Sequence, residues 1–176
     1  MYLISIYFDD ITNKKIQGMI NRLADVTENT FMIDEKIPPH ITLLEFETKD
    51  ENEAIRIFEE NANAFAQGEV LLVSIGTFKR NVIYVEPVLN KYLHNLSLET
   101  FEMFSQVKNI IFSPYYHPFS WIPHLSLGKH LTEGQLVKAF KKLINEFSPC
   151  SAKVTKISIS KTNPHRDLKI LDLNVK

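Results

Sequence analysis

The chain has 176 residues, 44% of them hydrophobic and 23% charged, and a formal net charge of −1 at pH 7. This size and balance indicate one globular domain or two small lobes sharing a core, and exclude a general electrostatic attraction to nucleic acid. No apolar run approaches the ~18 residues of a membrane span. The single cysteine, Cys150, excludes an internal disulfide and fits the cytoplasm, where we expect the protein.

The first half of the chain predicts alternating strands and helices. In order, these are a strand over 2–8, a helix over 14–26, a strand over 40–46, a helix from 48 to about 66 and a strand over 69–78. Asn13 is a candidate N-cap for the first helix, and Thr48 begins a capping-box pattern for the second. The first strand lacks the basic start of a signal peptide, so we expect none.

The second half repeats this order of elements. It predicts a strand over 82–88, a helix over 90–108, a strand over 122–128, a helix from Thr132 to 147, and strands over 153–161 and 168–175. The sequence therefore predicts an α+β protein with two pseudo-symmetric β-α-β-α-β lobes. We expect mostly antiparallel sheets facing a central cleft, with the helices outside. All residues, 1–176, form a single two-lobed domain, with lobe halves of roughly 1–80 and 81–176.

Two matching pentapeptides lie one in each half of the chain. Both read proline, histidine, aliphatic, small hydroxyl, aliphatic, and their sequences are Pro39-His40-Ile41-Thr42-Leu43 and Pro123-His124-Leu125-Ser126-Leu127. Side chains alternate between the two faces of a strand, so histidine and hydroxyl share a face and the aliphatic residues face a core. A single histidine of this kind is more often a packing residue, but its repetition favours a functional pair.

Two imidazoles in one cleft suit general acid–base catalysis. The ordinary histidine pKa of ~6.5 allows one ring to be neutral and the other charged near neutral pH. One ring then takes a proton from a nucleophile while the other gives one to a leaving group. Two nearby hydroxyls donate hydrogen bonds to an oxyanion. This set suits displacement at phosphorus without a covalent enzyme intermediate.

On these residues the sequence resembles the 2H phosphoesterase superfamily, which includes 2′-5′ RNA ligase-like proteins and cyclic phosphodiesterases. His40-Ile41-Thr42-Leu43 and His124-Leu125-Ser126-Leu127 each fit the family motif H-x-(T/S)-x. The resemblance implies a metal-independent site between two related lobes, without a cofactor. His40 and His124 would form the acid–base pair, and Thr42 and Ser126 would hold the substrate phosphate.

Lys129 is a further phosphate-binding candidate. It lies five positions after His124, where related proteins often carry a basic residue, usually arginine. Lysine lacks the bidentate fork of arginine. Strict alternation places Lys129 on the face opposite His124 unless Gly128 allows a bulge. A solvated lysine at a strand end is the equally weighted alternative.

Aromatic side chains supply secondary candidates. The residues between 112 and 121 either stack on a base or fill the core, and we favour the core. Tyr7, Tyr84 and Lys161 lie on predicted strands and are candidates to line the cleft, although a structural role is favoured for each. The remaining histidines form no metal-binding motif: His94, His117, His130 and His165.

The leading hypothesis is a metal-independent phosphodiesterase acting on a 2′,3′-cyclic phosphate or a 2′-5′ linkage. The expected partners are RNA ends or small nucleotides, the expected state is a monomer, and no membrane partner is expected. The alternatives are an RNA-end or nucleotide-binding module without turnover, the 2′-5′ ligation direction, and a metal-dependent hydrolase. The pseudo-symmetry does not say which histidine is the acid and which the base.

Overall fold

The computed structural model describes residues 1–175, and only the backbone of Asn63. Its helices are α1 (Asp10–Thr27), α2 (Phe31–Asp34), α3 (Glu51–Asn61), α4 (Lys91–Phe104) and α5 (Glu133–Glu146), with 3-10 turns η1 (Ala62–Ala64) and η2 (Pro114–Tyr116). Its strands are β1 (Tyr2–Phe8), β2 (Ile41–Glu47), β3 (Gly68–Phe78), β4 (Val82–Pro87), β5 (Ile111–Phe112), β6 (Leu125–Gly128), β7 (Cys150–Lys161) and β8 (Arg166–Asp172). The predicted α+β class is confirmed.

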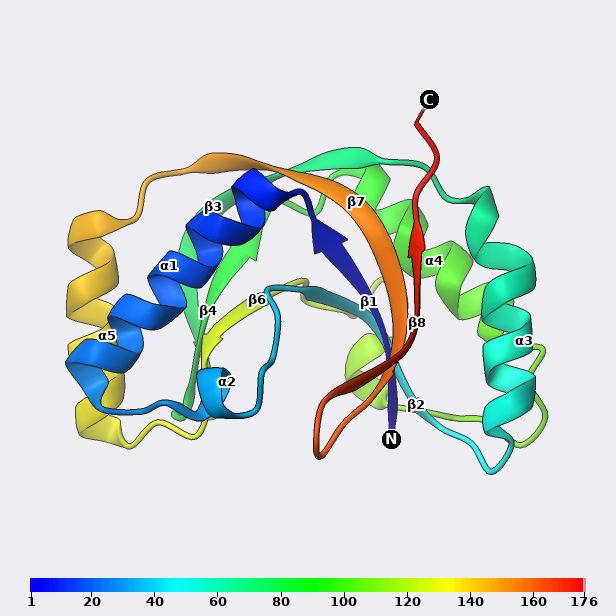
Figure 1. The fold of residues 1–176 in the computed structure, drawn as a ribbon, viewed down its shortest axis with the longest axis horizontal. Coiled ribbons are helices and arrows are strands. Elements are labelled where there is room, and N and C mark those ends of the chain that lie inside the picture. The colour runs from blue at the N-terminus through cyan, green and yellow to red at the C-terminus, as the bar shows by residue number, and fades with distance from the viewer. Residues whose placement is uncertain (176) are drawn as a thin grey trace.

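The strands are hydrogen-bonded into one eight-stranded sheet. Its order is β5-β2-β1-β7-β3-β4-β6, every neighbouring pair is antiparallel, and β8 also pairs with β7. One edge of β7 pairs with β1 over residues 154–161. The other edge pairs first with β3 and then with β8. The long strand β7 therefore joins the two lobes (Figure 1).

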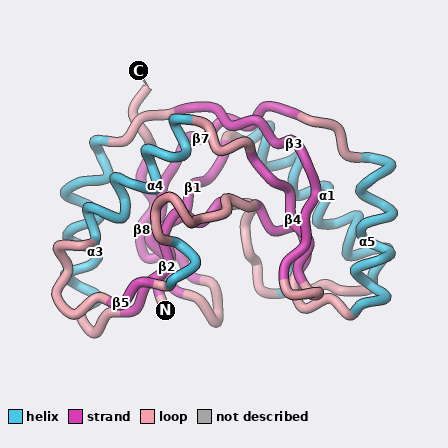
Figure 2. Tube along the Cα trace, turned by 180° about the vertical axis from the view of Figure 1, so that it is seen from behind, coloured by secondary structure: helices cyan, strands magenta, loops and turns pink. Residues whose placement is uncertain are grey.

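The helices lie in two pairs at opposite ends of the molecule. α1 packs against α5 at one end, and α3 packs against α4 at the other (Figures 1 and 2). Each lobe thus combines a helix from the first half of the chain with a helix from the second half. The predicted boundary near residue 80 separates the two sequence repeats. It does not separate the two helix pairs, because each pair contains one helix from either side of that boundary.

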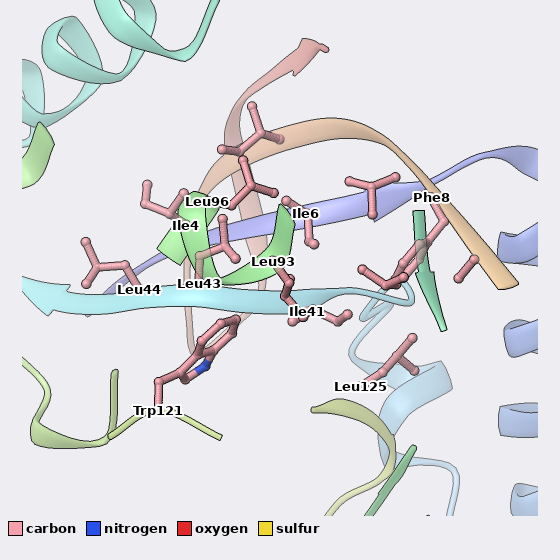
Figure 3. Close-up of a cluster of buried hydrophobic side chains, with 14 of the residues drawn as sticks. Ile4, Ile6, Phe8, Ile41, Leu43, Leu44, Leu93, Leu96, Trp121 and Leu125 are labelled. Carbon is pink, nitrogen blue, oxygen red and sulfur yellow. The ribbon is translucent and has the colours of Figure 1, made fainter. Parts of the chain in front are cut away.

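The aliphatic residues of both motifs enter the core, as expected. Ile41 and Leu43 lie with Leu93 and Leu96 of α4 beside the strands (Figure 3). Leu127 lies among residues of α1 and α5. The motif leucines and isoleucine are at most 1% exposed, so each motif strand is held by the burial of alternate side chains.

Two predicted helix caps are wrong. α1 begins four residues earlier than expected, because Asp9 accepts a hydrogen bond from Thr12 N at 2.9 Å and so takes the place predicted for Asn13. α3 is capped by Asp50, which accepts from Glu53 N at 2.9 Å, in place of Thr48. The capping box at Thr132 is confirmed.

The residues between the helix predicted over 14–26 and the strand predicted over 40–46 contain a short helix, α2, which the sequence did not indicate. Among the helices of residues 1–175, none is long and apolar enough to span a membrane.

Both motif strands carry a bulge at the same motif position. In β2, Leu44 pairs with Ile4 but Thr42 pairs with Ser5, which leaves Leu43 as the extra residue. In β6, the register likewise steps over Leu127, the leucine three positions after the histidine. A bulge reverses the alternation of faces, so the residue five positions after each histidine turns towards the histidine face.

Candidate active site

Each motif histidine immediately precedes its strand and makes the same backbone contact. His40 Nδ1 lies 2.8 Å from the carbonyl oxygen of Pro38, and His124 Nδ1 lies 3.0 Å from that of Ile122. A carbonyl only accepts, so Nδ1 carries the proton and donates in both rings. This fixes both tautomers and leaves each Nε2 for proton exchange.

A tyrosine edge also contacts each ring. Tyr7 of β1 meets His40 at 90° with ring centroids 6.4 Å apart, and Tyr84 of β4 meets His124 at 63° and 5.6 Å. Phe78 lies against His124 as well, at 4.8 Å. The two histidines therefore have related surroundings, because Tyr7 and Tyr84 lie on β1 and β4, the first strands of the two repeats.

The two histidines differ in burial. His40 is 7% exposed, whereas His124 is half-buried. Burial lowers the pKa of His40 to about 3, with a further contribution from the Lys129 charge. Burial also lowers the pKa of His124 below its ordinary value of 6.5, again assisted by Lys129. A charge is thus harder to place on His40 than on the more exposed His124.

The two motif hydroxyl residues, Thr42 on β2 and Ser126 on β6, are both buried. Thr42 is 5% exposed and Ser126 is 6% exposed. Thr42 Oγ1 lies 3.5 Å from Ser5 Oγ, a long contact. The Thr42 hydroxyl also makes a hydrogen bond with Tyr116, which opposes the rise that burial causes in the Tyr116 pKa. β2 and β6 approach within 8 Å between Cα atoms, so the two hydroxyls belong to facing strands.

The Lys129 ammonium lies between the two motifs. Its charge lowers the pKa of His40, of His124 and of a third histidine, His165. Burial in turn lowers the pKa of Lys129, while Glu45 raises it. The bulge at Leu127 explains this position, because it moves Lys129 from the opposite face to the histidine face.

Glu45 is a site residue that the sequence analysis missed. It lies five positions after His40, as Lys129 does after His124, and the bulge in β2 turns it in the same way. Burial raises the pKa of the Glu45 carboxyl, and the charges of Lys129 and Lys79 oppose that rise. The matching offset from the motif histidine was a usable signal in the sequence.

Two cavities meet at Lys129, and each contains one motif histidine. The larger, here called the aromatic pocket, has a volume of about 430 Å³ and includes His124, Ser126, Phe78, Tyr115, Tyr116 and Lys129. The smaller, called the hairpin pocket after the β7–β8 turn, has a volume of about 210 Å³ and includes His40, His165, Asn163, Thr162, Phe31 and Lys129. Lys129 therefore lines one cavity with His40 and another with His124.

The aromatic segment before β6 divides between core and pocket. Phe112 packs against Phe101, at 4.5 Å between ring centroids. Tyr115 is 67% exposed, lies in the aromatic pocket and has the Lys79 ammonium 5.2 Å from its ring centroid. The favoured core role holds for Phe112, whereas Tyr115 is available for stacking on a ligand.

His165 adds a third imidazole to the site. Its ring lies 6.0 Å from that of His40, at 23°. Tyr7 donates its hydroxyl proton to Asp167 Oδ1 at 2.6 Å, and His165 Nε2 lies 3.4 Å from the Tyr7 oxygen. In the sequence, His165 lies between the strands predicted over 153–161 and 168–175, and no local spacing links it to Tyr7, which is 158 positions away.

A metal site was one of the alternatives considered from the six histidines. Among residues 1–175 there is no group of three or more histidine, cysteine, aspartate or glutamate side chains arranged to hold a metal ion.

Solved structures share this fold over nearly their whole length. Escherichia coli LigT, solved with 3′-AMP, has a TM-score of 0.65 at 14% identity, with 98% of this chain and 97% of that chain covered. TT0787 of Thermus thermophilus has a TM-score of 0.64 at 12% identity, with 99% and 98% covered. A protein described as a phosphoesterase has a TM-score of 0.61 at 14% identity, with 98% of both chains covered. A comparison with curated protein sequences finds no match.

A match to a family model places the chain in the 2H phosphoesterase superfamily, as the resemblance predicted. The family model of the 2′-5′ RNA ligase superfamily matches residues 13–166, and the chain belongs to that family. Membership supports a phosphodiesterase-type function.

Proposed function

We propose that the protein is a metal-independent phosphodiesterase that opens 2′,3′-cyclic phosphates, with His40 and His124 as its acid–base pair. One observation carries the proposal. The His40 and His124 rings each donate Nδ1–H to the carbonyl two residues earlier in the chain, and the charge of Lys129 lowers the pKa of both. In the proposal, the Nε2 atoms of both rings face one anion site, as a concerted proton transfer requires.

The difference in burial assigns the two roles. The buried, neutral His40 removes a proton from water, whose oxygen forms a bond to phosphorus. The bond from phosphorus to one ring oxygen breaks, and His124 gives that oxygen a proton. The products are a phosphomonoester and a free hydroxyl, and the proton taken up by His40 later returns to solvent or to His124. His124 suits the acid role because its greater exposure makes a charge on it less costly.

The remaining site residues bind the phosphate in this proposal. Thr42 and Ser126 donate hydrogen bonds to its non-bridging oxygens, and Lys129 balances its negative charge. The nucleoside enters the aromatic pocket, whose volume lies in the usual range of ~300–1,000 Å³ for ligand sites. LigT has been solved with 3′-AMP, ATP, NADP+ and phosphate, which favours a nucleotide as the ligand here too.

The same geometry supports the cleavage or ligation of a 2′-5′ linkage. In cleavage, the 3′-hydroxyl replaces water as the nucleophile, and the two histidines exchange roles. A nucleotide-binding module without turnover is the second candidate, because Lys129 stands where relatives often have arginine. We also propose that the partners of the protein are RNA ends or small nucleotides, that the protein is a monomer, and that it is located in the cytoplasm.

A turnover assay with 2′,3′-cyclic nucleotides in the presence of EDTA tests the proposal. We expect hydrolysis by the natural protein and losses in kcat of ~10²-fold or more in His40→Ala and in His124→Ala. Thr42→Ala and Ser126→Ala should lose less. Binding without hydrolysis would favour the non-catalytic module. Activity that EDTA abolishes and zinc or manganese restores would favour a metal-dependent hydrolase.

A further inference from the structure

Glu45 is a charged residue that the proposed reaction does not use. The bulge at Leu43 turns its side chain to the face of His40, and it lines the aromatic pocket together with Lys129. A carboxylate in the lining of a site for an anion repels the ligand and weakens its binding. A use for this repulsion follows from the charges of the pocket, of the substrate and of the product.

The charged groups of the aromatic pocket leave one positive charge. Of the lining residues that the structure describes, Lys79, Lys129 and Glu45 carry a charge when His124 is neutral. Burial lowers the pKa of His124, so its neutral form is favoured before a ligand binds. Two ammonium groups and one carboxylate therefore leave a single positive charge to balance a ligand.

Positive groups from three parts of the chain face Glu45. Burial raises the pKa of the Glu45 carboxyl, while a side-chain hydrogen bond with Ser113 lowers it. The charges of Lys129, Lys79 and the N-terminal amino group lower it further and favour the ionised form. Glu45 is thus a carboxylate held among the cations of the site.

The charge of Glu45 also acts on groups beside the proposed phosphate position. Burial lowers the pKa of Lys129, and the Glu45 charge opposes this by raising it. Burial raises the pKa of the Tyr116 hydroxyl, and the Glu45 charge raises it further. Tyr116 makes a hydrogen bond with Thr42, whose hydroxyl binds the phosphate in the proposed function. A phosphate between Lys129 and Thr42 would therefore lie within reach of the Glu45 charge.

Hydrolysis changes the charge of the ligand. A 2′,3′-cyclic phosphate carries one negative charge, which matches the single positive charge of the pocket. Its hydrolysis gives a phosphomonoester, which loses a further proton with a pKa of ~6 and so approaches two negative charges above pH 7. The second charge has no cation left to balance it, and Glu45 repels it in a partly buried site where salt screens weakly.

We propose that Glu45 is a specificity-determining residue, which disfavours dianionic phosphomonoesters relative to monoanionic diesters and so promotes release of the product. The inference rests on the proposed function and adds a reason for the opposite charges after the two motif histidines. Lys129 attracts any phosphate. Glu45, at the equivalent position of the other repeat, limits that attraction to one negative charge, which is selection by repulsion of the wrong ligand.

Two ligands that differ by one charge test the inference. They are 3′-deoxyadenosine 2′-phosphate, a dianion at pH 8, and its methyl ester, a monoanion at the same pH. The 3′-deoxy sugar has no hydroxyl that could attack phosphorus. Titration calorimetry measures both dissociation constants for the natural protein, for Glu45→Gln and for Glu47→Gln. Glu47→Gln is the matched control, because Glu47 lies on the same strand, is exposed and lines neither pocket.

We expect the ratio of dissociation constants, monoester over methyl ester, to fall ~5-fold or more in Glu45→Gln and to stay constant in Glu47→Gln. Binding of the methyl ester shows that each variant is folded. A ratio that is unchanged or higher in Glu45→Gln, or that falls equally in both variants, would overturn the inference. Failure of the natural protein to bind either ligand would overturn it too. Because the ratio needs no turnover, a lack of hydrolysis of cyclic phosphates would contradict the proposed catalysis alone.

Discussion

Burial distinguishes His40 from the other histidines of this chain. At 7% exposure it is the only one of the six whose side chain belongs to the buried set. Its ring is enclosed by Tyr7 and His165, and its Nδ1 is committed to the Pro38 carbonyl. A neutral ring is stable in this environment, but a charged ring would need an anion beside it. In the proposed mechanism, a bound phosphate supplies that anion, so the substrate itself would enable His40 to take a proton.

The lowered pKa of His40 has a consequence for stability. Between the ordinary value of 6.5 and about 3, the unfolded chain binds a proton that the folded protein does not. The free energy of unfolding should therefore fall as the pH drops below 6.5, with a contribution from His40 of up to ~1.4 kcal/mol per pH unit. Urea denaturation of His40→Gln should show a shallower loss between pH 6.5 and 4 than the natural protein. Equal slopes would mean that His40 is not buried as a neutral ring.

In the proposed mechanism, Lys129 contributes both to substrate binding and to proton transfer. Lys129→Met should weaken substrate binding ~10-fold or more, because a charge-assisted contact to the phosphate is lost. It should also raise the pKa of His40 and His124, since the positive charge that lowers both is gone. The acid limb of kcat/KM against pH should then move to higher pH. Lys129→Arg is the control that keeps the charge, and a limb that moves equally in both variants would contradict this account.

The irregular pairing of strand β6 explains why Lys129 reaches the proposed site. Strict alternation along β6 would have turned it away, and the bulge at Leu127 turns it back. The equivalent bulge at Leu43 brings Glu45 to the corresponding place in β2. The two repeats thus differ in the sign of the charge at one shared position. This difference breaks the pseudo-symmetry of the site and gives its two sides different surroundings.

The start of α1 offers a test of the fold at the scale of one element. Asp9 accepts from Thr12 N, whereas Asn13 lies inside the first turns of the helix. Asp9→Ala should lower the free energy of unfolding by ~1 kcal/mol, as the loss of an N-cap does. Asn13→Ala should leave it unchanged or slightly higher, since alanine favours helix interiors. Urea denaturation at pH 7 measures both, and a larger loss in Asn13→Ala would place the cap at Asn13.

The sequence predicted features that depend on local pattern. The duplicated motif, the α+β class and the cap at Thr132 all follow from spacings of a few residues, and the family match and the structure confirm the class and that cap. Features set by distant parts of the chain could not be predicted. His165 meets Tyr7 across 158 positions, and no periodic pattern records that contact. The Leu127 bulge depends on how β6 pairs with β4, so the position of Lys129 stayed open.

At the scale of the whole molecule, the two lobes are joined in a single sheet by β7, with the helix pairs at the far ends (Figure 1). The arrangement places β2 and β6 opposite one another, although they lie near opposite ends of the strand order. Each contributes a histidine and a hydroxyl. The proposed site is therefore assembled between the repeats, and neither repeat alone contains both members of the proposed acid–base pair.

The central claim is that His40 and His124 divide the roles of base and acid. A 2′,3′-cyclic phosphate in which sulfur replaces the departing ring oxygen tests it directly, because a thiolate, with a thiol pKa of ~8.5, leaves without a proton. We compare kcat for the oxygen and sulfur substrates in the natural protein, His40→Ala and His124→Ala. The account predicts that the sulfur substrate restores His124→Ala by ~10-fold or more relative to the oxygen substrate and leaves His40→Ala impaired. Restoration of His40→Ala instead, of both variants equally, or of neither would contradict it.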